Sequence, residues 1–156
     1  MSRREQIQMT RGEIDRFLGA ARTMILCSNG RDGAPHPMPM WFGVEPDGTV
    51  VMTTFTKSQK IRNLERDPRV SLLVEAGEKY DELQGVVLYG EAELVRELPA
   101  VLDILARVTG RTGGAPNVDD AVLRAGLEAT ARKRTGIRVR PTRVVSWDHR
   151  KLGGVY

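Results

Sequence analysis

Cysteine, histidine and aromatic residues are all scarce in this chain of 156 residues. Its one cysteine, Cys27, cannot form an internal disulfide and lies in an apolar run, where we expect a buried structural thiol. The two histidines lack the spacing of a zinc site, so no bound metal is expected. No apolar run is long enough to span a membrane, and no apolar secretion signal follows Met1. These absences predict a cytoplasmic protein without a membrane partner.

The rest of the composition is that of an ordinary globular protein. Hydrophobic residues make up 40% and charged residues 28% of the chain, which predicts one domain over residues 1–156 with a real core. The net charge is only +4, but eight lysines and arginines lie between Arg132 and Lys151, against one acid, Asp148. This basic segment either binds an anionic ligand or is a solvated strand face. No helix-turn-helix or aromatic-rich pattern accompanies it, so we expect no nucleic acid.

Six apolar or alternating stretches predict β-strands. They cover residues 24–28, 35–44, 49–54, 69–75, 85–96 and 136–147. Three prolines in the second stretch predict an edge or bulge there, and Gly90 predicts a bulge in the fifth. Helices are predicted after the capping-box pair Thr10 and Glu13, over 58–66, from 99 to 108, and from about 120. Hairpin-linked strands interrupted by helices predict an antiparallel barrel with peripheral helices.

The junction between the third strand and the following helix is the most informative segment. Hydroxyl groups of Thr53, Thr54 and Ser58 can donate hydrogen bonds, Lys57 and Lys60 supply positive charge, and the helix start offers free N–H groups. Such a junction suits a phosphate, although it has no glycine spacing of a P-loop or dinucleotide fold. The alternative is an exposed helix start whose lysines are merely solvated.

In this order the pieces resemble the pyridoxamine 5'-phosphate oxidase-like split β-barrel family of flavin and deazaflavin proteins. The resemblance rests on Asp32-Gly-x-Pro35, Thr53-Thr54, Lys57-Ser-Gln-Lys60 with Asn63-Leu64, Asp67-Pro-Arg-Val-Ser71, the strand from Gly85 to Gly90, and the ending Ser146-Trp-Asp-His-Arg-Lys-Leu152. The ending is similar to that of an actinobacterial branch described as deazaflavin-dependent oxidoreductases using coenzyme F420. The resemblance implies a mainly β fold, a six-stranded antiparallel split β-barrel of the FMN-binding type with peripheral helices. It also implies a homodimer with two cofactor sites at the subunit interface.

Carried over position by position, the resemblance places Lys60 on the cofactor phosphate, with Ser58 and Thr53 beside it. Thr54 would contribute a hydroxyl or backbone group, and Lys57 faces either the phosphate or solvent. The strand Met38, Pro39, Met40 and Trp41 would lie along the ring system with backbone amides aimed at its polar edge. His36 is either a polar contact to the ring or a surface residue, and Trp41 either stacks on the ring or packs in the core. The sequence lacks the arginine-rich phosphate set of the founding oxidases, which counts against vitamin B6 oxidation.

Neither a nucleophile–base triad nor a spaced pair of catalytic carboxylates is recognisable, as expected when a cofactor carries the chemistry. The resemblance therefore implies an enzyme, a reductase in which reduced F420 passes a hydride to an electron-poor small-molecule substrate. The alternatives are an FMN-binding oxidoreductase of the same fold and a non-catalytic protein that carries flavin, deazaflavin or haem. The segment Arg132-Lys-Arg134 either meets the polyglutamate tail of a deazaflavin or is a solvated helix end.

The fifth strand suggests how two subunits would meet. Val86 and Leu88 lie on one of its faces and Val87 and Tyr89 on the other, so the strand is apolar on both sides. A strand covered on both sides is more than a monomer of this size easily provides. We therefore expect an obligate homodimer.

Overall fold

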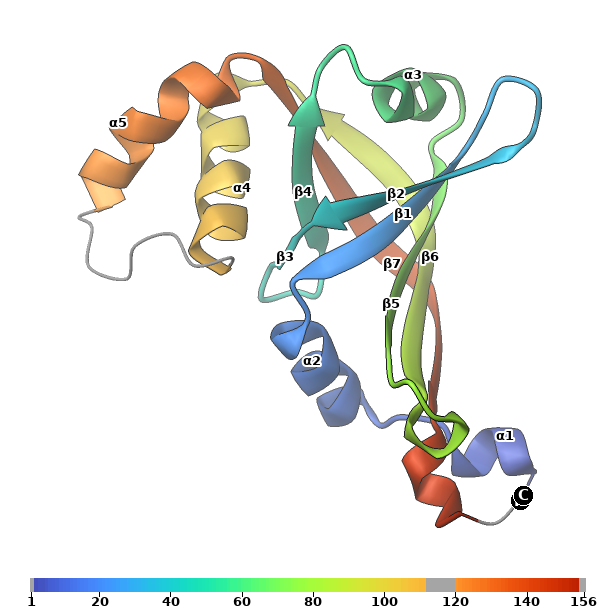
Figure 1. Ribbon diagram of the computed structural model, residues 1–156. Helices are drawn as coiled ribbons and strands as arrows, with labels where there is room; N and C mark the ends of the chain where they lie inside the picture. The colour runs from blue at the N-terminus through green and yellow to red at the C-terminus, as the bar shows by residue number, and fades with distance from the viewer. Residues whose placement is uncertain (1, 112–119, 155–156) are drawn as a thin grey trace.

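A single antiparallel sheet dominates the computed structural model, which describes residues 2–111 and 120–154 (Figure 1). The described strands are β1 (Thr23–Asn29), β2 (Pro35–Trp41), β3 (Gly43–Val44), β4 (Val50–Phe55), β5 (Arg69–Ala76), β6 (Gln84–Val95) and β7 (Arg134–Asp148). Their order in the sheet is β2-β1-β5-β6-β7-β4-β3. The predicted strand 35–44 divides into β2 and the two-residue β3, and the other five strands correspond to the other five predicted strands. The sheet curls on itself and confirms the predicted split β-barrel with peripheral helices.

The split lies between β2 and β4. These two strands approach each other without pairing, because β2 pairs only with β1 and β4 pairs with β7 and, over two residues, with β3. The proline-rich strand is therefore at an edge, as predicted. The missing N–H groups of Pro35, Pro37 and Pro39 all fall on one side of β2. Pairing with β1 continues along the whole strand, which puts that side at the free edge.

The helices close the barrel from three directions. They are α1 (Arg3–Gln6), α2 (Arg11–Ala20), α3 (Gln59–Arg66), α4 (Leu98–Arg111) and α5 (Asp120–Ala131), with 3-10 turns η1 (Tyr80–Glu82) and η2 (His149–Leu152). Figure 1 shows α3 at one end of the barrel, α2 toward the other, and α4 and α5 beside β4. The predicted capping box at α2 is present, since Thr10 N donates to Glu13 Oε2 and Glu13 N donates to Thr10 Oγ1. None of the described helices is long and apolar enough to cross a membrane.

Two apolar clusters hold these layers together. The larger fills the inside of the barrel and contains Leu26, Phe42, Met52 and Leu72, none of which is exposed. The smaller lies between the outer face of β4 and the helices α4 and α5, around Val51 and Ile104. Close approach of α4 requires a glycine in β7, because a Cβ at Gly136 would lie 2.8 Å from Ile104 Cδ1. Strand β4 is therefore buried on both faces.

Away from α4 and α5, the outer face of the sheet carries a row of apolar side chains that crosses five strands. The register aligns Pro39 with Ile25, Leu73, Val87 and Val145. These five side chains are half-buried or exposed in the single chain. Cys27 lies on the same face and is only half-buried, so the expectation of a buried thiol was wrong: in β1 it alternates with the buried Leu26. The predicted bulge at Gly90 is present as a register shift between β6 and β7.

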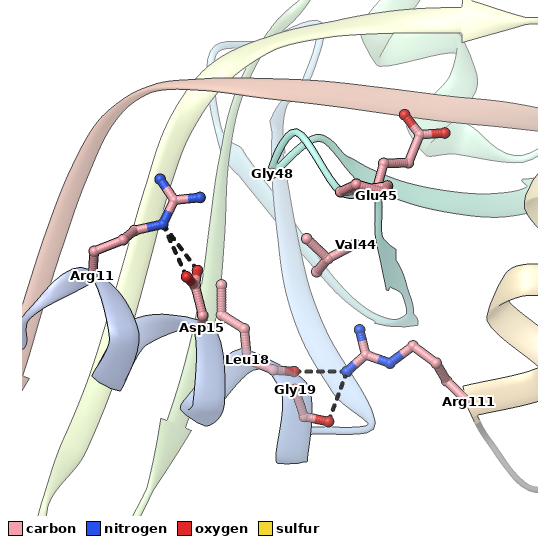
Figure 2. A pocket seen from close by; sticks show the side chains of 9 residues that line it. Arg11, Asp15, Leu18, Gly19, Val44, Glu45, Gly48 and Arg111 are labelled. Atoms are coloured by element: carbon pink, nitrogen blue, oxygen red, sulfur yellow. Dashed lines mark hydrogen bonds and ion pairs between the residues drawn. The ribbon is translucent and has the colours of Figure 1, made fainter.

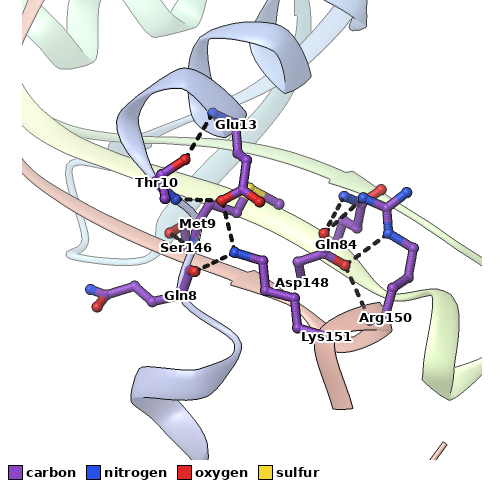
Figure 3. A network of polar contacts seen from close by, with 9 residues as sticks. All are labelled: Gln8, Met9, Thr10, Glu13, Gln84, Ser146, Asp148, Arg150 and Lys151. Atoms are coloured by element: carbon purple, nitrogen blue, oxygen red, sulfur yellow. Dashed lines mark hydrogen bonds and ion pairs between the residues drawn. The ribbon is translucent and has the colours of Figure 1, made fainter. Parts of the chain in front are cut away.

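The two ends of the chain are joined beside the barrel (Figure 3). Asp148 N donates to Ile7 O at 2.7 Å, and Met9 N donates to Ser146 Oγ at 3.1 Å. Lys151 Nζ lies 2.8 Å from Gln8 O and 2.7 Å from Glu13 Oε2. The segment after β7 is therefore an anchor for the start of α2 rather than a free tail.

Candidate functional site

The strongest candidate for a binding site is the junction of β4 and α3 that the sequence singled out. A tight turn joins the two elements, with Ser58 N donating to Phe55 O at 2.9 Å. In the first turn of α3 the side chain of Lys60 points back into the barrel, where only 8% of the residue is exposed. Its Nζ donates to Thr54 Oγ1 at 3.2 Å. Because burial disfavours the charged form, the pKa of Lys60 lies below its ordinary value.

Lys60 thus forms a buried cation that lacks a matching anion. The described part of the chain provides no carboxylate that forms an ion pair with it, and a single hydroxyl is its hydrogen-bond partner. A buried ammonium held in this way is costly unless a ligand neutralises it. Its surroundings are therefore suited to the phosphate or carboxylate of a bound molecule.

Several other buried polar atoms have no hydrogen-bond partner in the described part of the chain. Two of them belong to residues that the sequence singled out, Ser58 Oγ and His36 Nδ1. Ser58 occupies the N-cap position of α3, but its side chain makes no capping hydrogen bond, which leaves its hydroxyl available. Buried donors and acceptors are rarely left unsatisfied, so both atoms indicate a place where a ligand completes the hydrogen bonding.

His36 is connected to α3 through the neighbouring strand. It lies opposite Ser28 in the register of β2 with β1. Ser28 Oγ in turn accepts a hydrogen bond from Asn63 Nδ2 of α3 at 3.1 Å, and Asn63 is fully buried. Gln59 Nε2 donates to Asn63 Oδ1 at 2.9 Å, which ties the start of α3 into the same network. The network fixes α3, and with it Lys60, against β1.

The structure does not bring all the predicted side chains together, because neighbours along a strand face opposite ways. Thr54 faces the inside of the barrel with Lys60. Thr53 faces outward, where Arg134 Nη1 lies 3.4 Å from both its carbonyl oxygen and its Oγ1. Lys57 is exposed on the turn. The inward part of the predicted phosphate set therefore consists of Thr54 and Lys60, with the unpartnered Ser58 at the helix start.

The predicted ring-binding strand divides in the same way. Met38 and Met40 share the inner face of β2 with His36, whereas Pro39 and Trp41 face outward. Trp41 is 62% exposed, so it does not pack in the core. Since the prolines put their missing donors on the free edge, that edge offers a ligand carbonyl oxygens and, within residues 38–41, only the N–H of Trp41. Backbone contacts to a ring would thus come mainly from acceptors.

Sequence reasoning missed the individual role of Arg134. This residue begins β7 opposite Phe55, and its guanidinium lies 4.8 Å from the centre of the Phe55 ring. Arg134 Nε is buried and has no partner. By contrast, Arg132 pairs with Glu128, and Lys133 is exposed. The three basic residues looked alike in sequence; only the register of β4 with β7 shows that Arg134 adjoins the candidate site.

The described residues show no sign of a metal centre. Within 2–111 and 120–154 no group of three or more histidine, cysteine, aspartate or glutamate side chains is arranged to hold an ion. The groups present at the β4–α3 junction, namely Lys60, Thr54 and Ser58, suit the binding and orientation of an anionic organic molecule.

Comparison with known protein families identifies the family of this chain. The sequence model described as pyridoxamine 5'-phosphate oxidase matches residues 10–148. The chain belongs to the pyridoxamine 5'-phosphate oxidase family. The match runs from the start of α2 to the end of β7 and includes the β4–α3 junction, so the resemblance seen in the sequence is confirmed.

Solved structures agree with this family assignment. A conserved hypothetical protein from Mycobacterium tuberculosis, Rv2991, is 40% identical, with a TM-score of 0.89 over 100% of this chain and 95% of that chain. An F420 reductase is 24% identical, with a TM-score of 0.64 over 83% and 94% of the two chains. HutZ, the haem storage protein from Vibrio cholerae, is 20% identical, with a TM-score of 0.67 over 87% and 94%. The last two share the fold. A search of curated protein sequences found no match.

Proposed function

We propose that this protein is an oxidoreductase that uses reduced coenzyme F420 to transfer a hydride to an electron-poor small-molecule substrate. The observation that carries the proposal is the buried ammonium of Lys60 beside Thr54, which no described carboxylate neutralises, in a barrel of the pyridoxamine 5'-phosphate oxidase family. The structural similarity to an F420 reductase supports the proposal, because that protein shares the fold of this chain.

The residues at the β4–α3 junction fit the phosphate of such a cofactor. Lys60 would supply the charge, Ser58 Oγ and Thr54 Oγ1 would supply hydroxyls, and the first N–H groups of α3 lie at the same place. Each charge-assisted contact would also remove a cost, because it satisfies a group that the protein leaves unpaired. His36 and the inner face of β2 would border the ring.

Arg134 supports the deazaflavin over FMN. It provides a second cation near the same turn, with an unpartnered Nε and an exposed aromatic neighbour, Phe55. FMN has one phosphate to satisfy, whereas a deazaflavin also carries a polyglutamate tail. A second cation facing away from the barrel interior suits the additional carboxylates.

In the proposed reaction the bound deazaflavin supplies the hydride, and the protein contributes position and environment. Lys60 and Ser58 would hold the anionic end of the cofactor and so orient it. Met38 and Met40, on the inner face of β2, would provide an apolar surface that keeps water from the reacting face. His36 Nδ1 is a buried ring nitrogen available to accept or donate one hydrogen bond there.

The proposal includes a homodimer whose two cofactor sites lie at the subunit interface. The half-exposed apolar row on the outer sheet face, together with the free edge of β2, gives each subunit a surface for this contact. The substrate would then bind beside the ring.

A fluorescence titration with both cofactors at moderate salt tests the proposal. We expect F420 to bind in preference to FMN. Micromolar binding of FMN with no binding of F420 would overturn the cofactor assignment and favour an FMN oxidoreductase. The absorbance spectrum of the protein as purified gives an independent check, since a deazaflavin has one near-violet band, a flavin two separated bands and haem a Soret band. Tight F420 binding without turnover of any electron-poor alkene would favour a carrier.

A further inference from the structure

A cavity of about 360 Å³ lies far from Lys60, between α2, the β3–β4 turn and the end of α4 (Figure 2). It is at the Val50 end of β4, whereas Lys60 is at the Phe55 end. Leu18 and Val44 form its apolar part, and Arg11 and Arg111 stand on opposite sides of it. Its volume is in the range of sites for small organic molecules, about 300–1,000 Å³.

Arg111 is the most unusual group in the wall of this cavity. Its Nη2 donates to three carbonyl oxygens at the end of α2, those of Leu18 at 2.6 Å, Gly19 at 3.2 Å and Ala21 at 2.9 Å. One face of the guanidinium lies 4.5 Å from the centre of the Phe42 ring, which is completely buried. These contacts hold Arg111 in place and leave it little freedom to turn toward solvent.

No full negative charge compensates Arg111 within the described chain. All three of its hydrogen bonds are to neutral carbonyls, and burial alone lowers its pKa. The second terminal nitrogen, Nη1, makes no hydrogen bond there and points toward Val44 across the cavity in Figure 2. Glu45 turns its carboxylate away, toward Arg138 at 3.8 Å. Among the described residues, Nη1 of this fixed cation therefore has no acceptor, and it faces the cavity on the side of Val44.

A second, smaller cavity of about 140 Å³ continues the first. Both are lined by Leu18, Val44 and the exposed ion pair of Arg11 with Asp15, and the second reaches Leu88 and Val144. Exposed ion pairs are weak, about 0–1 kcal/mol, so this pair does not firmly separate the two spaces. Together they form a trough that has Arg111 at one end. Its apolar part consists of Leu18, Val44, Leu88 and Val144, and charged side chains, among them Arg11 and Asp15, also line it.

We propose that this trough binds a small organic carboxylate with an apolar body. The carboxylate would accept hydrogen bonds from Arg111 Nη1, and the apolar body would cover Leu18, Val44 and Leu88. Neutralising a cation that is already held in place requires no rearrangement of the protein, which favours binding. The site is separate from the proposed cofactor site and does not depend on it.

Phenylacetate and its neutral counterpart phenylacetamide are suitable probes, followed by backbone amide NMR shifts during titration. We expect phenylacetate to change the amide chemical shifts of Leu18, Gly19 and Val44. Its affinity should be about tenfold or more above that of phenylacetamide. Val44→Trp fills the cavity and should weaken phenylacetate at least about tenfold. Val122→Trp makes the same change at an exposed position of α5 and should leave binding unchanged.

Two further variants separate the charge from the fold. Arg111→Lys keeps the charge but removes the planar guanidinium, which contacts the α2 carbonyls with one nitrogen and the cavity with another. It should weaken the binding of phenylacetate about tenfold and leave the binding of phenylacetamide unchanged. Lys60→Met should keep the wild-type response, whatever it does to F420. Equal shifts from both probes would overturn the assignment of an anionic ligand. Wild-type affinity in Val44→Trp, or shifts confined to other parts of the chain, would overturn the site itself.

Discussion

At the scale of single residues, the most informative feature is a buried charge that destabilises the fold in the absence of ligand. Lys60 is almost fully buried, yet the Thr54 hydroxyl is the one hydrogen-bond partner that residues 2–111 and 120–154 give it. Burial lowers its pKa below the ordinary 10.5. Between that folded-state pKa and 10.5 the unfolded chain binds the extra proton, so the free energy of unfolding rises with pH in this window. At neutral pH the charged ammonium therefore destabilises the fold.

Replacing Lys60 by methionine should consequently change stability and cofactor affinity in opposite directions. Removing the buried charge while keeping an unbranched side chain should raise the free energy of unfolding by about 1 kcal/mol, or the Tm by about 2–4 °C. The same change should weaken cofactor binding roughly tenfold to hundredfold by loss of a charge-assisted contact. Thermal unfolding and fluorescence titration measure the two effects.

Arg62→Met is the matched control, since Arg62 lies on the same helix but is exposed. It should alter neither quantity much. Arg66 would be a poorer control, because its Nη2 donates to Asn29 O at 2.6 Å and so contributes to the fold. Lower stability in Lys60→Met with unchanged cofactor affinity would show that the ammonium serves the fold and not a ligand.

Local sequence identified Lys60, Thr54 and Ser58 because they are close along the chain and their chemistry suits a phosphate. It could not separate Thr53 from Thr54, since that requires knowing which face of β4 is turned inward. It also could not distinguish Arg134 from Arg132, because only long-range pairing of β4 with β7 brings Arg134 opposite Phe55. Residue types are local properties, whereas their partners depend on register.

At the scale of elements, periodicity predicted the long strands and helices well. Six strands follow from alternating or continuous apolar runs, and the prolines of β2 correctly marked an edge. Three short helical elements were missed, namely α1, which is four residues long, and the 3-10 turns η1 and η2. The break that divides the predicted strand 35–44 into β2 and the two-residue β3 was also missed. Segments of that length carry too few residues for a period to be recognisable.

The junction between η2 and α2 was also invisible in sequence, because it joins residues far apart in the chain. Glu13 caps the first turn of α2 and also contacts Lys151 (Figure 3). The hydrogen bond from Lys151, followed by those from Thr10, lowers the pKa of Glu13 from 4.5 to about 2. Its stabilising contribution is therefore present above pH 4.5 and is lost as the pH falls toward 2.

Glu13→Gln should reduce the fall in Tm between pH 4.5 and pH 2, because the carboxylate that must be protonated there is gone. Thermal unfolding across this range is the measurement. Asp15→Asn, on the same helix, removes a carboxylate that pairs with a largely exposed arginine and should change the profile little. If Glu13→Gln and the wild-type chain lose Tm equally between these pH values, Glu13 does not link the two ends of the chain.

At the scale of the whole molecule, the single chain leaves a sheet face incompletely covered. The inner faces of β5 and β6 are buried in the barrel, but the outer row from Pro39 through Leu73 and Val87 to Val145 stays partly exposed. The sequence predicted that β6 would be apolar on both faces, and the structure shows which residues belong to which. Leu88 is 3% exposed and lies in the core, whereas Val87 faces outward.

Because Leu88 faces the core and Val87 faces outward, only a charge at Val87 can test the proposed homodimer. Aspartate at Leu88 would be buried in the barrel and would unfold the chain, so it cannot report on association. Val87→Asp places the charge in the middle of the outer row, where it would be desolvated only if a second subunit covers it. Light scattering should then show a monomer of 17.3 kDa, and cofactor binding should be lost in the same variant. Val122→Asp, at an exposed position of α5, should change neither mass nor affinity. A Val87→Asp monomer that binds the cofactor normally would mean that each barrel holds its ligand without help from a partner.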